Sequence, residues 1–316
     1  MSLLLRLLRH ILSRGRFIAP IADLSAYVPN TDKSAMGAIN RPLHDKEIFV
    51  MGISTATRPL HLEASTFRTL LELQGPSLGL WRAAEIAVLR EQTYEHPVLD
   101  LGCGDGLVTS LVLSYVEIGV DPDEKSLLQA KGRGIYGSFE ARPVEEMQLP
   151  ANSIGTVLSN SVLEHIANID TVLATIARIL RPGRRLIFTT PTPTFSQWLA
   201  FPWQSYAERR NRQLRHLNLW SVECWAAHLE EVGLEIEYVR PYLGRPLVRL
   251  WDILELLQQV WIGHHRLWSI FWRHIPPDML TYLATRASQL DLAASNTGGG
   301  QLIVAHKKDV YANGNG

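Results

Sequence analysis

A short apolar strand that runs directly into a glycine-rich turn constrains the fold of this chain more than any other feature. The run VLDL at 98–101 is followed by Gly102-Cys103-Gly104-Asp105-Gly106 and then by the apolar start of a helix. Glycines at alternate positions let the backbone turn sharply and let a ligand approach the main chain. The pattern therefore predicts a strand, a turn and a helix, with a ligand held at the turn.

Short apolar runs alternate with helical stretches along the rest of the chain, which is typical of repeated βα units around a mostly parallel sheet. Candidate strands lie at 98–101, 115–120, 135–139, 154–159, 185–190, 235–240 and 301–306. Candidate helices lie at 107–113, 125–131, 169–180 and 221–231, and Arg181-Pro182-Gly183 is expected to end the third of them. The spacing therefore predicts an α/β fold with a Rossmann-like sheet.

The chain divides into four expected parts. Residues 1–76 read as an N-terminal amphipathic helix followed by an irregular cap, 77–241 as the α/β core, 242–297 as a helical insertion, and 298–316 as the last core strand and a tail. The insertion carries apolar residues at helical spacing from Leu250 to Phe271, interrupted by charges that exclude a transmembrane span. Its expected roles are a lid, an interface or a membrane-surface contact.

The first seventeen residues, MSLLLRLLRHILSRGRF, carry leucines at helical spacing interrupted by arginines. They are too charged to span a bilayer and lack a small-residue cleavage site. Two interpretations stay open, a helix that packs on the domain and a helix that lies on an anionic membrane surface. We expect a cytoplasmic protein, with peripheral contact at the inner membrane surface under the second interpretation.

Composition excludes some partners. Thirty-one basic residues balance thirty-one acidic ones, so the chain has no global positive field that would attract nucleic acid. The two cysteines are Cys103, inside the glycine turn, and Cys224, and this low count fits a reducing compartment. Nothing in the sequence indicates a metal site, and the oligomeric state stays open.

The chemistry of the turn narrows the choice of ligand. A helix N-terminus favours a carboxylate, and Asp100 at the end of the strand can face an ammonium group, so the pattern suits the amino-acid end of S-adenosylmethionine. A dinucleotide-binding turn has glycine where this chain has Leu107. Asp121 ends the second strand and is our candidate for the ribose hydroxyls, with a helix N-cap as the alternative.

Five motifs in order resemble the class I S-adenosylmethionine-dependent methyltransferases, specifically the methyltransferase type 11 group. They are VLDLGCGDG, GVDPDEKSL, EEMQLP, SNSVLEHI and ILRPGRRLIFTTP. The resemblance implies a seven-stranded sheet of order 3-2-1-4-5-7-6 with the last strand antiparallel and S-adenosylmethionine at its carboxyl edge. The cofactor-binding residues that we predict are Asp100, Gly102, Cys103, Gly104, Gly106, Asp121, Pro122, Glu145, Glu146 and Asn160.

For three of these residues the resemblance also implies which part of the cofactor they contact. Glu145 would lie near the adenine, with Glu146 as the neighbouring alternative in register, and Asn160 would meet the methionyl portion. The chain departs from the usual pattern at Ile154-Gly155, where the family commonly has Phe-Asp, and in the length of the segment at 242–297.

The activity implied is methyl transfer by in-line displacement to a small-molecule, lipid-linked or glycan acceptor. His165 and His216 are the candidate catalytic bases, each with local packing as its alternative. Between the fifth and sixth strands, aromatic residues could line an acceptor pocket, and Arg209, Arg210, Arg212 and Arg215 could meet an anionic group. Two other functions stay open, an NAD-dependent oxidoreductase and a non-catalytic cofactor-binding member of a biosynthetic assembly.

Overall fold

The computed structural model describes residues 58–262, 265–266, 272 and 274–309, and the expected amphipathic helix at the N-terminus lies outside these residues. Its strands are β1 (Val98–Leu101), β2 (Val116–Val120), β3 (Tyr136–Glu140), β4 (Ile154–Asn160), β5 (Leu180–Pro191), β6 (Leu234–Tyr242), β7 (Trp261–Ile262), β8 (His265–Arg266) and β9 (Gly300–Lys307). Its helices are α2 (Ala64–Gln74), α3 (Pro76–Leu89), α4 (Leu107–Ser110), α5 (Glu124–Lys131), η3 (Val144–Glu146), η4 (Leu163–His165), α6 (Ile169–Ile179), α7 (Pro193–Gln197), α8 (Gln204–Leu214), α9 (Val222–Glu231), α10 (Arg245–Gln258) and α12 (Pro277–Ala287).

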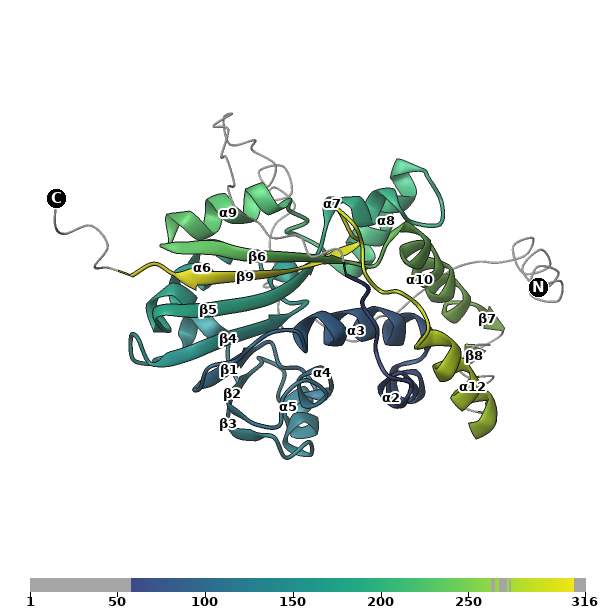
Figure 1. Ribbon diagram of the computed structural model, residues 1–316, viewed down its shortest axis with the longest axis horizontal. Helices are drawn as coiled ribbons and strands as arrows, with labels where there is room; N and C mark the ends of the chain where they lie inside the picture. The colour runs from purple at the N-terminus through teal and green to yellow at the C-terminus, as the bar shows by residue number, and fades with distance from the viewer. Residues whose placement is uncertain (1–57, 263–264, 267–271, 273, 310–316) are drawn as a thin grey trace.

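Seven strands form one mixed sheet in the order β3-β2-β1-β4-β5-β9-β6 (Figure 1). The first five strands pair in parallel, whereas β9 is antiparallel to both of its neighbours, β5 and β6. This order and the antiparallel last strand confirm the arrangement that the resemblance implied.

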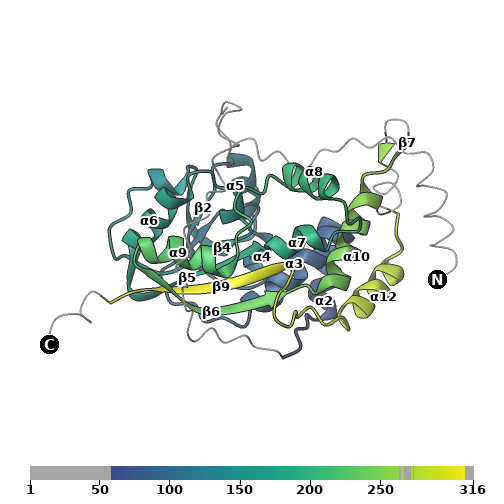
Figure 2. The same cartoon turned by 90° about the horizontal axis from the view of Figure 1, so that it is seen from above.

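Helices cover both faces of the sheet and produce two hydrophobic clusters. On one face α6 and α9 pack through residues such as Leu173, Ile176 and Trp225. On the other face α3 packs on the sheet, α2 and α10 pack against α3 through residues such as Phe67 and Trp251, and α12 packs against α2. Figure 2 shows α2, α10 and α12 gathered at one end of the molecule. The result is an α/β/α sandwich extended by a helical layer.

Local sequence explains several element boundaries. α6 buries residues at helical spacing, carries Asp170 in its first turn and Arg178 in its last, and so complements the helix dipole at both ends. At the start of α5 the side chain of Asp123 accepts hydrogen bonds from the backbone N–H groups of Lys125 and Ser126, as an N-cap does. Arg181-Pro182-Gly183, expected to end α6, lies within β5 instead, since the helix ends at Ile179.

The structure differs from two expectations about the segments outside the α/β core, the cap and the insertion. Part of the segment expected to be irregular is the helix α2, whose Phe67, Leu70 and Leu71 are buried. The apolar spacing at 250–271 does not form one helix, because α10 ends at Gln258 and the two-residue strand β7 follows. The helix α2 from the expected cap packs against α12 from the expected insertion, so both belong to the same helical layer.

Candidate functional site

The glycine turn after β1 has the sharp backbone conformation that its glycines predict. Gly102, Gly104 and Gly106 have φ angles of 72°, 53° and 70°, in the left-handed region that favours glycine. A Cβ at Gly102 would clash with the side chain of Val162. The N–H groups of Gly102 and Cys103 both donate to the carbonyl of Val120, at 2.7 and 3.0 Å, which ties the turn to the end of β2.

Asp121 lies directly beside this turn. Its Oδ2 accepts the N–H of Gly104 at 2.9 Å and its Oδ1 accepts the N–H of Asp123 at 2.9 Å. The side chain is 6% exposed, and burial raises its pKa. The N-cap of α5 is Asp123, which removes the alternative role considered for Asp121. Each carboxylate oxygen of Asp121 has a second lone pair with which to accept a hydroxyl group.

Asp100 is engaged inside the protein. It is 1% exposed, and its Oδ2 accepts hydrogen bonds from Thr109 Oγ1 and from Tyr136 Oη, both at 2.7 Å. Burial, together with the charge of Asp121, raises the pKa of Asp100 to about 6. The side chain therefore joins α4 and β3 beneath the turn, and burial likewise raises the pKa of the neighbouring Cys103 thiol.

A cavity of about 160 Å³ opens beside the turn. Apolar side chains form most of its wall, and Arg142, Glu145 and Asn168 add polar groups; the lining residues are Leu101, Gly102, Val120, Pro122, Arg142, Pro143, Val144, Glu145, Ile166, Ala167 and Asn168. Of the two neighbouring candidates, Glu145 lines the cavity and Glu146 does not. Only Glu145 of this pair therefore borders the cavity, and its place beside the adenine stays a prediction.

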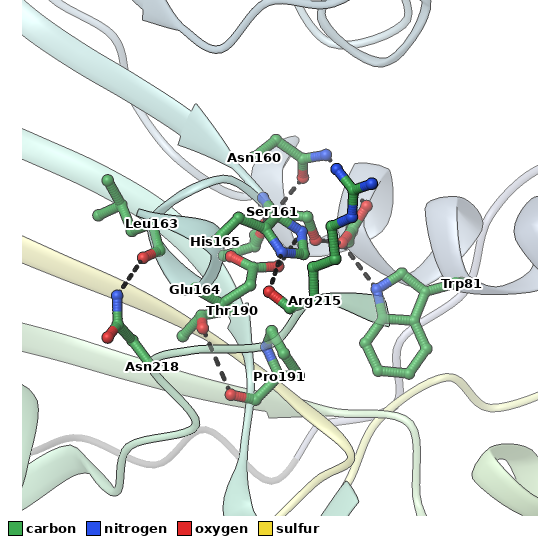
Figure 3. A network of polar contacts seen from close by, with 12 residues as sticks. Trp81, Asn160, Ser161, Leu163, Glu164, His165, Thr190, Pro191, Arg215 and Asn218 are labelled. Carbon is green, nitrogen blue, oxygen red and sulfur yellow. Dashed lines mark hydrogen bonds and ion pairs between the residues drawn. The ribbon is translucent and has the colours of Figure 1, made fainter. Parts of the chain in front are cut away.

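A second polar cluster lies where β4 ends (Figure 3). Its hydrogen bonds centre on Glu85 of α3. The carboxylate of Glu85 is fully buried and accepts hydrogen bonds from Trp81 Nε1 at 2.8 Å, from Asn160 Nδ2 at 3.1 Å and from Ser161 Oγ. Arg82 completes an ion pair with it at 2.6 Å. Asn160 is thereby fixed between α3 and β5, since its Oδ1 also accepts from Thr189 Oγ1 at 2.8 Å.

Glu164 is the second buried acid of this cluster, and its carboxylate accepts fewer hydrogen bonds than that of Glu85. It is 1% exposed, and its Oε2 has no hydrogen-bond partner among the described residues. Burial raises the pKa of Glu164 to about 8, with the charge of Glu85 adding to the effect and that of Arg82 opposing it. Its main-chain carbonyl accepts from the N–H groups of Leu217 and Asn218 and so attaches the segment after α8 to η4.

The structure brings the two candidate histidines together, with ring centroids 5.6 Å apart. His165 Nδ1 lies 3.0 Å from the carbonyl oxygen of Arg215, and its Nε2 lies 3.8 Å from Glu164 Oε1. Burial lowers the pKa of both histidines, that of His216 to about 3. His216 Nδ1 is buried without a partner in the described structure, and its ring packs against Phe195.

The four arginines of the segment after β5 do not share one environment. Arg210 is buried in an ion pair with Asp252 of α10 at 3.0 Å, whereas Arg209, Arg212 and Arg215 are exposed. The aromatic residues also separate: Phe195 is buried, and Phe201 stacks on the exposed Trp203 with centroids 5.2 Å apart. None of these aromatic side chains lines the cavity beside the glycine turn.

Sequence reasoning missed the acidic core of the second cluster. An arginine and a glutamate three residues apart, such as Arg82 and Glu85, are typical of a solvated helix face, but α3 buries twelve of its fourteen residues. Glu164 stands next to His165 in the motif that drew attention to the histidine, and this was the one local signal that could have found it. Tyr242, buried at the end of β6 with its hydroxyl unpartnered in the described structure, carried no such signal.

The described residues contain neither a metal-binding cluster nor a membrane-spanning helix. In 58–262, 265–266, 272 and 274–309, no group of three or more His, Cys, Asp or Glu side chains is arranged to hold a metal ion. In the same residues, no helix combines the length and the apolar character that a membrane span requires.

Comparison with known proteins points to one family. A family model described as a methyltransferase domain matches residues 99–188. The ubiquinone biosynthesis O-methyltransferase of Agrobacterium fabrum is 33% identical over 99 residues, which are 29% of this chain and 40% of that protein. The malonyl-[acyl-carrier protein] O-methyltransferase of Brevibacillus brevis is 30% identical over 178 residues, covering 52% of this chain and 63% of that protein.

A solved S-adenosylmethionine-dependent methyltransferase from Thermotoga maritima is 16% identical with a TM-score of 0.49, and the match covers 77% of this chain and 100% of that one. The chain spans about two fifths of the length of the ubiquinone-type relatives that it matches. The matched stretch runs from β1 through β5, so it contains both the glycine turn and the end of β4. These findings support a class I S-adenosylmethionine-dependent methyltransferase, and the part of the chain that matches the methyltransferase domain is residues 99–188.

Proposed function

We propose that this protein transfers the methyl group of S-adenosylmethionine to an oxygen atom of a small-molecule or lipid-linked acceptor. One observation carries the cofactor part of the proposal: the buried carboxylate of Asp121 accepts the N–H of Gly104 in the glycine turn, and its chain neighbours Val120 and Pro122 line the apolar cavity beside that turn. A nucleoside attached to an amino acid needs all three features, a flat apolar pocket, an acceptor for sugar hydroxyls and an open main chain.

Different residues of the described structure would contact the adenine, the ribose and the amino-acid end of the cofactor. Pro122, Val144 and Ile166 offer apolar walls for the adenine, and Glu145 offers an acceptor at its edge. Asp121 would accept hydrogen bonds from the ribose hydroxyls. The amino-acid end would lie along the glycine turn, where positive φ angles and the absence of side chains leave the main chain accessible.

Bound S-adenosylmethionine supplies an electrophilic methyl group on a sulfonium, so the protein's own task is alignment. Holding two reactants in line contributes up to about 7–11 kcal/mol to lowering a barrier. Glu85 serves this task because it fixes Asn160 and Ser161 against α3 at the end of β4. Those two side chains are thereby held in one arrangement before any ligand binds.

Oxygen is the acceptor atom that the relatives favour, because the two curated proteins named above are both O-methyltransferases. The acceptor's size and its attachment to a lipid or a glycan rest on the aromatic and arginine-rich segment after β5 alone. Oxidoreductase activity is the weaker alternative, since Leu107 occupies the position of the third dinucleotide glycine.

Isothermal titration with S-adenosylhomocysteine and with NADH tests the cofactor assignment. We expect binding of S-adenosylhomocysteine to the wild-type protein and a loss of about 10- to 100-fold in affinity for Asp121→Ala, because hydrogen bonds to a charged group contribute about 1.5–3 kcal/mol each. Asp123→Asn is the matched control, since asparagine also caps a helix and the ribose site is untouched. Binding of NADH alone would overturn the proposal.

Turnover separates an enzyme from a non-catalytic binder. The protein is incubated with methyl-labelled cofactor and an extract of its source cells, and both the label in products and the release of S-adenosylhomocysteine are measured. We expect enzyme-dependent release; binding without any release would support the non-catalytic alternative.

A further inference from the structure

Arg215 is an unusual residue at the edge of the second polar cluster. It is the C-cap of α8, with φ 54° and ψ 36°, a left-handed conformation that is uncommon for a residue other than glycine. Its carbonyl oxygen receives the hydrogen bond of His165 Nδ1. Its side chain is exposed, and among the described residues the guanidinium has no ion-pair or hydrogen-bond partner.

The backbone of Arg215 is thus fixed by a hydrogen bond, whereas its guanidinium group has no bonding partner among the described residues. Figure 3 places the residue in the same group as Asn160, Ser161 and His165. The charges of both Arg215 and Arg82 contribute to lowering the pKa of His165, so the two guanidinium groups act on the same histidine. Strained, well-held residues of this kind concentrate at ligand sites.

The buried and half-buried charged groups around this point are paired or neutral. Arg82 is paired with Glu85 at 2.6 Å, and Arg210 is paired with Asp252 at 3.0 Å. Glu164 keeps its proton near neutral pH because burial raises its pKa to about 8, and burial keeps both histidines uncharged. Arg215 therefore leaves this part of the site with an uncompensated positive charge, which favours an anionic ligand.

The same residues offer no well-placed base. A carbonyl oxygen can only accept, so His165 Nδ1 carries the proton, and its bare Nε2 faces Glu164 at 3.8 Å. His216 has a pKa of about 3, which makes it a weak base for a hydroxyl group. Glu164 is 1% exposed and cannot meet an acceptor directly.

We propose that the acceptor is a carboxylic acid, that Arg215 binds its carboxylate, and that the product is a methyl ester. This inference rests on the proposed methyltransferase function and specifies its substrate class. A carboxyl group is already ionised near neutral pH, whereas an alcohol or a phenol is not. A carboxylate is therefore the oxygen acceptor that fits a site with a free cation and no free base.

The reaction balances without proton transfer. A lone pair of a carboxylate oxygen forms the new bond to the methyl carbon, and the bond from that carbon to sulfur breaks. The electron pair of the broken bond stays on sulfur, so the sulfonium becomes the neutral thioether of S-adenosylhomocysteine. One anion and one cation thus give a neutral ester and a neutral sulfur, and no residue has to accept a proton.

The bond formed in the product gives the most direct test. The protein is incubated with methyl-labelled S-adenosylmethionine and source-cell extract, and the labelled product is treated with mild alkali. A methyl ester releases its label as volatile methanol, and that release is the expected result. Label that stays in the non-volatile product would belong to an ether, an amine or a phosphate ester and would overturn the proposal.

The role of Arg215 is tested with the same labelled product. We expect Arg215→Gln to raise the KM for the acceptor about 10- to 100-fold with a smaller change in kcat, and Arg215→Lys to recover part of the loss. Arg68→Gln is the control, because Arg68 is an exposed arginine on α2. Equal KM values for Arg215→Gln and Arg68→Gln would contradict a binding role.

Titration with S-adenosylhomocysteine in the same variants keeps the two proposals apart. We expect Arg215→Gln to bind it as the wild type does, since Arg215 does not line the cavity beside the glycine turn. If the wild type bound no S-adenosylhomocysteine, the proposed function itself would fail. If it bound and the label were alkali-stable, only the carboxylate inference would fail.

Discussion

At the scale of single residues, hydrogen bonding decides how two buried glutamates behave at the end of β4. Glu85 accepts from Trp81, Asn160 and Ser161 and pairs with Arg82, whereas Glu164 keeps one oxygen without a partner in the described structure. A buried carboxylate that lacks compensating hydrogen bonds is destabilised relative to its neutral form. Glu164 is therefore an uncharged acid near neutral pH.

The raised pKa of Glu164 predicts a specific dependence of stability on pH. The unfolded chain loses this proton near pH 4.5 and the folded chain near pH 8, so unfolding becomes more favourable as the pH rises between these values. Glu164→Gln removes the titrating group. We expect its melting temperature to equal that of the wild type near pH 4.5 and to exceed it by a few degrees at pH 9.

Glu72→Gln serves as the control for this comparison, because Glu72 is an exposed residue of α2. Its melting temperature should follow that of the wild type at every pH. A Glu164→Gln variant that is less stable than the wild type at pH 9 would show that the ionised carboxylate stabilises the fold, contrary to the prediction.

The residues that sequence predicted and those that it missed differ in where their partners lie. Asp121 and Gly104 are close in sequence, so a strand end beside a glycine turn could be read directly. Glu85 and Ser161 are separated by 76 residues, and only the folded sheet brings them together. An Arg82–Glu85 pair three residues apart looks like a solvated helix face until the neighbours that bury it are known.

At the scale of elements, a buried ion pair joins α8 to α10. Arg210 and Asp252 are 1% and 0% exposed, and Asp252 also accepts from Tyr206 Oη at 2.7 Å and from the N–H of Ala200 at 2.9 Å. Arg210 lies over the Trp251 ring, 5.4 Å from its centroid. The segment that follows β5 is thereby fixed to the helical layer through one network.

Removing one charge of the Arg210–Asp252 ion pair should lower the free energy of unfolding more than removing both charges. Arg210→Met leaves the charge of Asp252 buried and unpaired, and we expect it to lower the free energy of unfolding by about 3–5 kcal/mol. The double variant Arg210→Met/Asp252→Asn restores neutrality and should be more stable than the sum of the single effects predicts. Urea unfolding of Arg210→Met, Asp252→Asn and the double variant measures these free energies.

The exposed pair between Lys308 and Glu230 provides the comparison, since its side chains are 44% and 63% exposed. Lys308→Met should cost no more than about 1 kcal/mol. Strictly additive losses in the Arg210 and Asp252 variants would mean that the two side chains act independently.

The elements themselves were predicted with uneven success, for physical reasons. Each of the seven strands of the main sheet was expected within a few residues of its place, because buried apolar runs bounded by turns identify central strands. The helix α2 was missed although it buries Phe67, Leu70 and Leu71, since its context of turn-forming residues obscured a short periodic run. The helical spacing beyond Gln258 continued in the sequence without forming a helix.

At the scale of the whole molecule, α3 links the polar cluster at the end of β4 to the helical layer. It packs against α2 and α10, and it also supplies Glu85 to the end of β4. Several large apolar side chains remain exposed on this layer, among them Met279 and Tyr282 of α12, at 49% and 60%. These residues are the described part of the surface that we predict to contact a membrane.

Vesicle flotation tests that prediction. We expect the intact chain to float with vesicles of phosphatidylcholine and phosphatidylglycerol, and a chain lacking residues 1–16 or carrying Met279→Ser/Tyr282→Ser to float less. Deleting the whole of 245–290 is not a suitable test, because Trp251 and Leu280 belong to the buried core. Equal recovery of all forms in the soluble fraction would contradict membrane contact.

The three successive glycines that lead into β9 restrict how this protein can vary. A Cβ at Gly298 would collide with the backbone of Tyr242, one at Gly299 with the side chain of Val248, and one at Gly300 with the ring of Tyr242. A gene library randomised at these three codons should return almost only glycine among folded clones, whereas a smaller side chain at Val248 should widen the choice at Gly299 and one at Tyr242 the choice at Gly300. Evolutionary change at Gly299 and Gly300 therefore requires a paired change at the side chain that each contacts, whereas Gly298 is fixed by backbone atoms.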